Sequence, residues 1–281
     1  MKDWISPIPK IVHLIWIGDN PLPDYFKLFI DTFFKFMPEF QIKLWTDSNL
    51  NKKTFPKTYK YILKAKGYQG KPMVKSYLDT ETIHYYGKDK KIKNYSKFAQ
   101  ITDLMRLEII YNEGGFYFDT TFEILKPMYT LLNRKEHFVG SNEVPRFKTF
   151  SYLSNSFFGA TKNNPILERL LSEKKLNSID FSNVAVDNET GPGYLRSGIL
   201  LKDSYYIYPT TFFYPFVEEY SPGVNPSYRK ASKNKCHSKK KKKNYKKLKN
   251  NKGFIDFPCY KYKDSYALKH WQLGGSWYYW N

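Results

Sequence analysis

Cysteine is scarce in this sequence, which has only Cys236 and Cys259 among its 281 residues. A framework of several disulfides, which small extracellular domains use to compensate for a small core, is therefore excluded. The two cysteines could form a single bridge, but the N-terminal residues include no apolar stretch of a secretion signal. We therefore expect reduced thiols and a cytoplasmic protein.

Long apolar runs are also missing, because no stretch approaches the roughly 18 uninterrupted apolar residues of a membrane-spanning helix. We expect a soluble protein without a transmembrane segment. Hydrophobic residues nevertheless make up 41% of the sequence and aromatic residues 19%, which excludes a disordered chain. The length predicts one large α/β domain with insertions.

Acidic residues are few, with 26 Asp and Glu against 46 Lys and Arg, and the formal net charge is +20. The segment 229–252 holds 13 Lys or Arg and no acid, which leaves +7 for the rest of the chain. We interpret this lysine-rich segment as a surface insertion. It is either a solvated loop, the commoner case for such runs, or a patch that makes weak contact with anionic surfaces. Outside it, the sequence lacks the basic and aromatic pattern of a specific nucleic-acid-binding protein.

The first half of the chain contains a predicted βαβ unit. Residues 10–17, KIVHLIWI, form a near-continuous apolar run that is typical of a parallel strand buried on both faces. Apolar residues then recur at helical spacing over 24–37, and QIKLW at 41–45 predicts a second strand.

The most informative segment is 98–127, FAQITDLMRLEIIYNEGGFYFDTTFEILKP. Its first part predicts a helix on which Asp103 and Arg106 lie three residues apart and are therefore neighbours. The Gly114–Gly115 pair ends the helix, because glycine readily takes the left-handed angles of a helix C-terminus. Residues 116–118 then form a short buried strand, and Asp119 follows at its carboxyl end, where open α/β sheets bind ligands. In isolation the Asp103 and Arg106 pair would be interpreted as a surface ion pair; the strand and Asp119 that follow favour a ligand site instead.

These residues resemble the DXD-motif glycosyltransferases of family 32, which include fungal mannosyltransferases and capsule-type sugar transferases. The family pattern of a small residue, Ser-Asp-x-x-Arg and Gly-Gly-x-Tyr-x-Asp-x-Asp is similar to Ala99, Thr102, Asp103, Arg106, Gly114, Gly115, Tyr117 and Asp119. The resemblance implies an α/β fold of the GT-A type over residues 1–281, with a central mixed sheet, helical additions and the lysine-rich insertion.

The same resemblance implies a retaining transferase that moves a hexose from a nucleotide sugar, UDP-linked, to a glycan, a protein or another hydroxyl acceptor. Asp103, Arg106 and Asp119 are the implied catalytic residues, and no covalent nucleophile is expected. Trp16 would stack on the base; taken alone, it would be interpreted as a core aromatic residue. The implied nucleotide-sugar site comprises Ile15, Trp16, Asp103, Arg106, Tyr117, Asp119, Thr121, Ser276 and Trp277.

The metal site is where the sequence departs from the family. The family's second DXD aspartate is Thr121 here, so a divalent metal, Mn²⁺ or Mg²⁺, would be held by Asp119 with His270, and Glu123 is a more distant substitute. Two alternatives follow from Thr121. The chain is either an enzyme with an altered metal requirement, or a catalytically degenerate protein of the same fold that binds nucleotide or glycan without transfer.

Further segments are similar to family motifs. The segment from Asn155 predicts a buried strand and a helix beginning at Pro165, with a packing role. The turn at 190–193, Thr-Gly-Pro-Gly, would let the backbone pass close to the acceptor or sugar. An aromatic strand is expected from Tyr206, and Lys269 stands where many relatives have a histidine.

Overall fold

The structure is a computed structural model that describes residues 3–18, 21–22, 24–67, 95–144, 152–181, 186–214 and 265–269. The expectations for Cys236, Cys259, His270, Ser276, Trp277 and the segment 229–252 lie outside the described residues and stay predictions. The single-domain organisation of residues 1–281 likewise stays a prediction.

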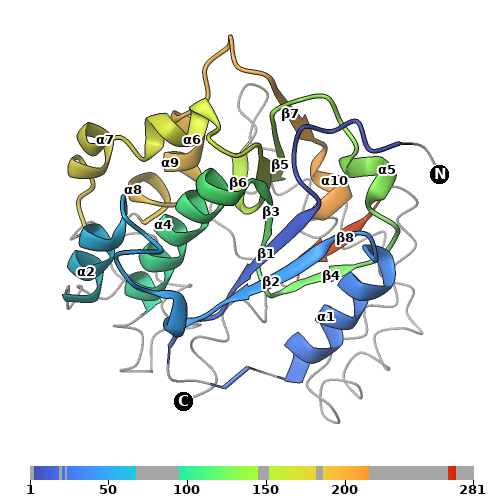
Figure 1. Cartoon of the computed structure of the whole chain (residues 1–281), viewed down its shortest axis with the longest axis horizontal. Helices are drawn as coiled ribbons and strands as arrows, with labels where there is room; N and C mark the ends of the chain where they lie inside the picture. The colour runs from blue at the N-terminus through green and yellow to red at the C-terminus, as the bar shows by residue number, and fades with distance from the viewer. Residues whose placement is uncertain are drawn as a thin grey trace, which may run out of the picture.

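A six-stranded mixed sheet forms the centre of the described part, in the order β2-β1-β3-β6-β5-β7 (Figure 1). Strands β1, β2 and β3 run parallel, β6 runs antiparallel to β3 and β5, and β7 is parallel to β5. The predicted α/β class with a central mixed sheet is therefore confirmed. The strands of this sheet are β1 (Ile11–Ile15), β2 (Gln41–Trp45), β3 (Gly115–Phe118), β5 (Phe138–Val144), β6 (Tyr152–Ala160) and β7 (Tyr205–Tyr208).

Helices lie on both faces of this sheet, as Figure 1 shows. The longest is α4, which packs with α2, α6, α7 and α9 over one face, while α1, α5 and α10 lie over the other. The helices are α1 (Asp24–Phe36), η1 (Asp47–Asn49), α2 (Tyr59–Gly67), α4 (Tyr95–Glu113), α5 (Tyr129–Leu132), α6 (Pro165–Leu170), α7 (Glu173–Asn177), α8 (Val186–Glu189), α9 (Pro192–Ser197) and α10 (Thr210–Phe213).

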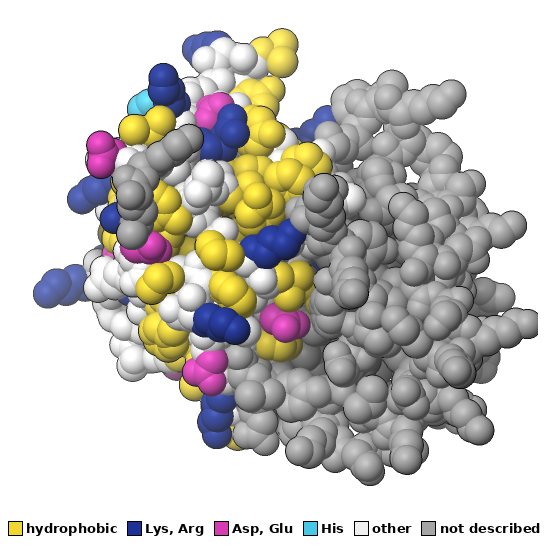
Figure 2. Space-filling view, turned by 90° about the vertical axis from the view of Figure 1, so that its right-hand side faces the viewer, with side chains coloured by type: hydrophobic (Ala, Val, Ile, Leu, Met, Phe, Trp, Pro, Cys, Tyr) yellow, Lys and Arg dark blue, Asp and Glu magenta, His cyan; other side chains and the backbone are white. Residues whose placement is uncertain are grey.

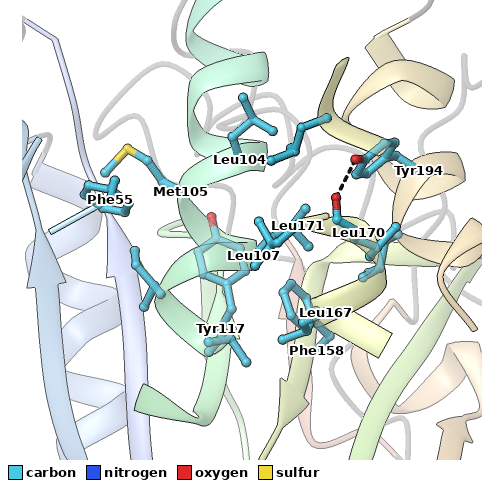
Figure 3. Packing of buried hydrophobic residues seen from close by; sticks show 14 of the residues in the cluster. Phe55, Leu104, Met105, Leu107, Tyr117, Phe158, Leu167, Leu170, Leu171 and Tyr194 are labelled. Atoms are coloured by element: carbon cyan, nitrogen blue, oxygen red, sulfur yellow. Dashed lines mark hydrogen bonds between the residues drawn. The ribbon is translucent and has the colours of Figure 1, made fainter. Parts of the chain in front are cut away.

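The side chains of strand β3 are divided between the two helical layers. Alternate side chains of a strand point to opposite faces, so Phe116 and Phe118 join the cluster under α1, while Tyr117 joins the cluster under α4. Figure 3 shows this second cluster, in which Leu104 and Leu107 of α4 lie close to Leu170. The short strand is buried on both faces, and its end is therefore held in a fixed position.

The predicted βαβ unit is present as β1, α1 and β2. Strand β1 pairs in parallel with β2 from Ile11↔Gln41 to Ile15↔Trp45, and Phe29 and Phe33 of α1 are buried under the sheet. The predicted aromatic strand from Tyr206 is shorter than the expectation, because β7 ends at Tyr208. Pro209, which cannot donate to a sheet ladder, is instead the N-cap residue of the short helix α10.

The junction of α4 and β3 confirms the predicted role of the two glycines. Gly114 has a φ of 70° and Gly115 a φ of 101°, values that residues with a Cβ atom rarely adopt. A Cβ atom on Gly115 would also lie 2.6 Å from the backbone oxygen of Ile11. The helix can therefore turn directly into a strand that pairs with β1.

A small second sheet lies beside the end of β3. Strands β4 (Phe122–Ile124) and β8 (Ala267–Lys269) pair antiparallel, with Phe122 opposite Lys269. This pairing brings a residue from near the C-terminus of the chain to within a few residues of Asp119.

None of the described helices is long and apolar enough to cross a membrane. On the face drawn in Figure 2, basic and acidic side chains of the described residues are interspersed among hydrophobic ones. The described side chains on this face are therefore of both signs, while 13 of the basic residues of the sequence fall within 229–252.

Candidate functional site

The candidate site lies where the carboxyl ends of β1, β2 and β3 meet. Trp16 and Asp119 directly follow β1 and β3, and both strands point to the same edge of the sheet. The turn after β1 is fixed by Asp47, whose Oδ2 atom accepts a hydrogen bond of 2.7 Å from the backbone N–H of Gly18. Parallel strands of an open α/β sheet bind ligands at this edge.

Asp119 is the most exposed acid of the predicted set, because 24% of its side chain is accessible. Its Oδ1 atom accepts a hydrogen bond of 2.7 Å from the hydroxyl of Tyr117 and lies 3.4 Å from Nη1 of Arg106. Its Oδ2 atom accepts a hydrogen bond from the ammonium of Lys269. The carboxylate is therefore oriented by three groups while part of it faces solvent.

Arg106 lies behind Asp119, and only 7% of its side chain is exposed. Nε donates to the backbone oxygen of Thr102 at 3.1 Å, and Nη1 donates to the backbone oxygen of Asn155 at 2.8 Å and to Asp119. Nη2 donates to the hydroxyl of Thr102 and lies 3.2 Å from Oδ1 of Asp103. Four hydrogen bonds therefore engage the guanidinium, and the ion pair with Asp103 adds to them. In this arrangement Arg106 orients Asp119.

Asp103 is buried and paired with Arg106, so the interpretation of this pair as a surface ion pair is wrong. Its Oδ1 accepts a hydrogen bond of 2.8 Å from the side-chain amide of Asn155, and its Oδ2 accepts one of 2.9 Å from the hydroxyl of Thr190. Three donors therefore surround one carboxylate. Asp103 links α4 to β6 and to the segment that precedes α9.

Lys269 reaches the site from β8, and only 4% of its side chain is exposed. Its ammonium lies against Asp119, donates to the hydroxyl of Ser156 at 3.0 Å, and lies 5.6 Å from the centre of the Phe122 ring. A buried ammonium is costly unless it is paired, and Asp119 is its pairing carboxylate.

The electrostatics of the two carboxylates differ. Burial acts to raise the pKa of Asp119, but the charges of Lys269 and Arg106, with hydrogen bonds from Lys269 and Tyr117, lower it to about 2. Burial raises the pKa of Asp103 to about 6, against the opposing effects of Arg106 and its hydrogen-bond donors. Burial also raises the pKa of Tyr117 well above its usual range, so its hydroxyl remains a donor to Asp119.

The residues present do not fit a divalent metal at the DXD position. Both oxygens of Asp119 already accept hydrogen bonds from protein groups, and one of the donors is the ammonium of Lys269. Thr121 offers a neutral oxygen, which is buried and has no hydrogen-bond partner among the described residues. Mg²⁺ and Ca²⁺ prefer charged oxygen ligands, whereas a metal here would face two cations. The predicted ligand His270 lies outside the described residues.

The predicted site residues fall into two groups. Asp103, Arg106, Tyr117 and Asp119 are brought together by α4 and β3, as predicted. Ile15 and Trp16 are buried at the end of β1, where the prediction placed them. Contact of Ile15, Trp16 and Thr121 with a nucleotide, and the catalytic roles of Asp103, Arg106 and Asp119, stay predictions.

Three residues that bind Asp103 or Asp119 directly were not predicted as site residues. Asn155 was expected to have a packing role, yet it bonds both Asp103 and Arg106. Thr190 binds Asp103 directly, although the turn that contains it was expected to approach a sugar or acceptor through its backbone. Lys269 was noted only as a residue that replaces a histidine of many relatives. That replacement was the signal in the sequence that could have indicated its place in the site.

Most of the first half of the chain matches a known protein family. Residues 23–139 match the family described as "Glycosyltransferase sugar-binding region containing DXD motif". This range includes α4, β3 and Asp119. The predicted resemblance to DXD-motif glycosyltransferases is confirmed, and membership of family 32 stays a prediction.

A curated relative is described as "Toxin", from Photorhabdus asymbiotica subsp. asymbiotica. It is 27% identical to this chain over 176 residues, which are 59% of this chain and 6% of the toxin. This chain therefore spans only a small fraction of the length of the curated relative that it matches.

Two solved structures are also similar. The "PaToxG Glycosyltransferase" is 22% identical, with 68% of each chain covered and a TM-score of 0.39. The UDP-bound glycosyltransferase domain from the YGT toxin is 12% identical, with 72% of this chain and 79% of that chain covered and a TM-score of 0.40.

Proposed function

We propose that the glycosyltransferase-like domain of this chain transfers a hexose from a nucleotide sugar to a hydroxyl of a glycan or protein acceptor, with retention of anomeric configuration. UDP is the nucleotide that we propose. The proposal joins the match of residues 23–139 to a sugar-binding region with the arrangement of side chains at the end of β3.

The observation that carries the proposal is the oriented and partly exposed carboxylate of Asp119. Its pKa of about 2 keeps it ionised at neutral pH, so it is an acceptor for the hydroxyls of a ribose or a sugar. Such charge-assisted hydrogen bonds contribute about 1.5 to 3 kcal/mol each. Arg106 and Asp103 are positioning residues in this account, because their polar atoms are engaged with protein groups.

The proposed transfer step does not require Asp119 to accept a proton. The bond between the anomeric carbon and a diphosphate oxygen breaks, and its electron pair stays with the diphosphate. The acceptor oxygen bonds the same carbon from the same face, and its proton passes to the leaving diphosphate oxygen. Asp119, with a pKa far below neutral pH, is a poor general base and serves to orient the donor.

Trp16 is the proposed contact for the base. It directly follows β1 at the same sheet edge as Asp119, and its backbone N–H donates to the oxygen of Trp45 at the end of β2, at 2.8 Å. Stacking of a base on an indole contributes about 1 to 3 kcal/mol. A nucleotide with its base on Trp16 and its ribose or sugar at Asp119 would follow the edge of the sheet.

A second candidate function is favoured by Thr121. Its hydroxyl oxygen is neutral and buried, and it stands where the family has a metal-binding aspartate. The second candidate is therefore a protein that binds nucleotide sugars without transferring them.

Calorimetry with a panel of UDP and GDP sugars, paired with chromatographic measurement of nucleotide release, tests both candidates. We expect one UDP sugar to bind and to release UDP slowly by hydrolysis, and faster when an acceptor is present. Binding without release would support the non-catalytic alternative. If no member of the panel binds, the proposed site assignment is wrong.

A further inference from the structure

Two departures from the DXD pattern occur at the same place in this molecule. Thr121 removes a carboxylate from the motif, and Lys269 brings an ammonium to the remaining one, Asp119. Thr121 directly precedes β4, and Lys269 ends β8 opposite Phe122. At this place a neutral side chain therefore stands where the family has a carboxylate, and an ammonium pairs with the carboxylate that remains.

Lys269 is built into the site and is not a surface side chain that happens to reach it. Its position is set by the pairing of β8 with β4, and its ammonium is bound by Asp119 and, at 3.0 Å, by Ser156. The side chain is 4% exposed. Breaking such a buried pair by removal of one partner leaves an uncompensated charge, so the pair persists as a unit.

The ion pairs at the site that the described residues form are balanced in charge. Asp103 and Asp119 carry two negative charges, and Arg106 and Lys269, which contact them, carry two positive charges. A divalent metal added to this set would leave an excess of two positive charges in a partly buried position, without a further carboxylate at Thr121 to offset it. With Lys269 paired to it, the charge of Asp119 is neutralised without a metal ion, so it does not repel a diphosphate bound beside it.

We propose that Lys269 takes the place of the divalent metal, so that this chain binds the diphosphate of a nucleotide sugar without a metal ion. The inference rests on the proposed function, since it concerns the same donor site. Lys269 neutralises Asp119 and supplies the positive charge that the leaving diphosphate needs when the bond to the sugar breaks. Arg106 adds a second, fixed positive charge behind the same carboxylate.

The wild-type protein provides the first test, with no substitution that could impair folding. Calorimetry with UDP, and with the UDP sugar that the panel identifies, is carried out in EDTA and again with manganese or magnesium. We expect the dissociation constants in the two conditions to agree within about twofold. A loss of tenfold or more in EDTA that manganese or magnesium restores would overturn the inference and leave the proposed function intact. Absence of binding in both conditions would instead refute the proposed function.

Substitution of Lys269 provides the second test. Lys269→Met keeps most of the length of the side chain and removes its charge, so UDP affinity in EDTA should fall at least about tenfold, the loss expected for a charged contact. Lys269→Arg, which keeps the charge, should lose less. Lys43→Met is the matched control, because Lys43 pairs with Glu113 at 2.6 Å in a different ion pair, and it should leave the affinity unchanged.

Thermal melts establish that each variant is folded before its affinity is interpreted. Unchanged UDP affinity in a folded Lys269→Met variant would overturn the inference, because the charge would then serve only the fold. If Lys269→Met does not fold, the EDTA comparison on the wild-type protein decides by itself.

Discussion

Asp103 and Arg106 hold their positions through a closed set of hydrogen bonds that reaches across the fold. Arg106 bonds Thr102 and Asn155 and pairs with both carboxylates, while Asp103 accepts from Asn155 and Thr190. Charged groups with this degree of burial are stable only when each polar atom has a partner. The side chain that remains partly open to solvent is Asp119, which is therefore where a ligand can make contact.

The raised pKa of Asp103 gives a pH dependence of stability with a definite sign. Burial raises it to about 6 from an ordinary value of 3.8, so between about pH 4 and pH 6 the folded state holds a proton that the unfolded state has lost. The contribution of Asp103 to the free energy of unfolding therefore increases as the pH falls through this window. Asp119, with its pKa of about 2, stays ionised throughout.

Urea unfolding at pH 7 and pH 5 of the wild type and of Asp103→Asn measures this contribution, because other titrating groups cancel in the difference. We expect the wild type to gain stability on acidification relative to Asp103→Asn. Identical pH dependence in the two proteins would show that Asp103 does not titrate in this window.

Metal binding can be engineered at Thr121 only if Lys269 is changed as well. Asp119 would remain paired with the ammonium of Lys269, so Thr121→Asp alone should leave manganese affinity weak. In Thr121→Asp combined with Lys269→Ser, two carboxylates face no ammonium, and manganese affinity should rise at least about tenfold, since such metals favour carboxylate ligands. Calorimetric titration with manganese chloride compares the two variants. Equal affinities would show that Lys269 does not exclude a metal.

At the scale of elements, the site depends on the direct passage from α4 into β3. The pair Gly114–Gly115 reverses the chain in left-handed conformations, so that Arg106 on the helix and Asp119 after the strand come within 3.4 Å of each other. Strand β3 is four residues long, and this length determines how far Asp119 lies from the turn.

Gly115→Ala should destabilise the protein by about 2 kcal/mol or more, because its backbone conformation is strained for alanine and the new Cβ would meet the backbone oxygen of Ile11. Gly140→Ala is the matched control. Its Cβ would meet the end of the Leu153 side chain, which can move, so its loss should be smaller. Chemical denaturation compares the two, and equal losses would contradict the argument.

The elements that carry the site were predictable because their signals are local. The apolar run of β1, the helical stripe of α1 and the Gly-Gly break after α4 each depend on residues close in sequence, and each prediction was confirmed. The convergence of Asp103, Arg106 and Asp119 was also predictable, since all three lie within a stretch of 17 residues.

The remaining contacts were not predictable from spacing, because they join distant segments. Asn155 is 52 residues from Asp103, Thr190 is 87 residues from it, and Lys269 is 150 residues from Asp119. Neither periodicity nor local motifs determine which strand lies beside which at such separations. The end of β7 at Tyr208 was missed for another reason: the aromatic run continues past Pro209 into a helix.

At the scale of the whole molecule, charge is unevenly distributed along the chain. The lysine-rich segment accounts for 13 of the basic residues, while the charges at the site are balanced in buried pairs. We therefore attribute the proposed affinity of the site for a diphosphate to the side chains at the site and not to the excess positive charge of the chain.

Deletion of residues 233–250 should shift the melting temperature by only a few degrees, because the segment has almost no apolar area to bury and loop entropy changes slowly with length. Donor binding should be unchanged. Differential scanning calorimetry of the deletion variant checks the first expectation, and insoluble or unfolded protein would show that the segment is part of the fold.

The most direct test of the central claim, that Asp119 at the end of β3 holds a nucleotide sugar, is calorimetry of donor binding to Asp119→Ala. Asp31→Ala, which removes an exposed carboxylate from α1, is the control. We predict that Asp119→Ala weakens binding of the donor about tenfold or more, as expected for the loss of a charged hydrogen bond, while Asp31→Ala binds like the wild type. Unchanged affinity in a folded Asp119→Ala variant would contradict the account.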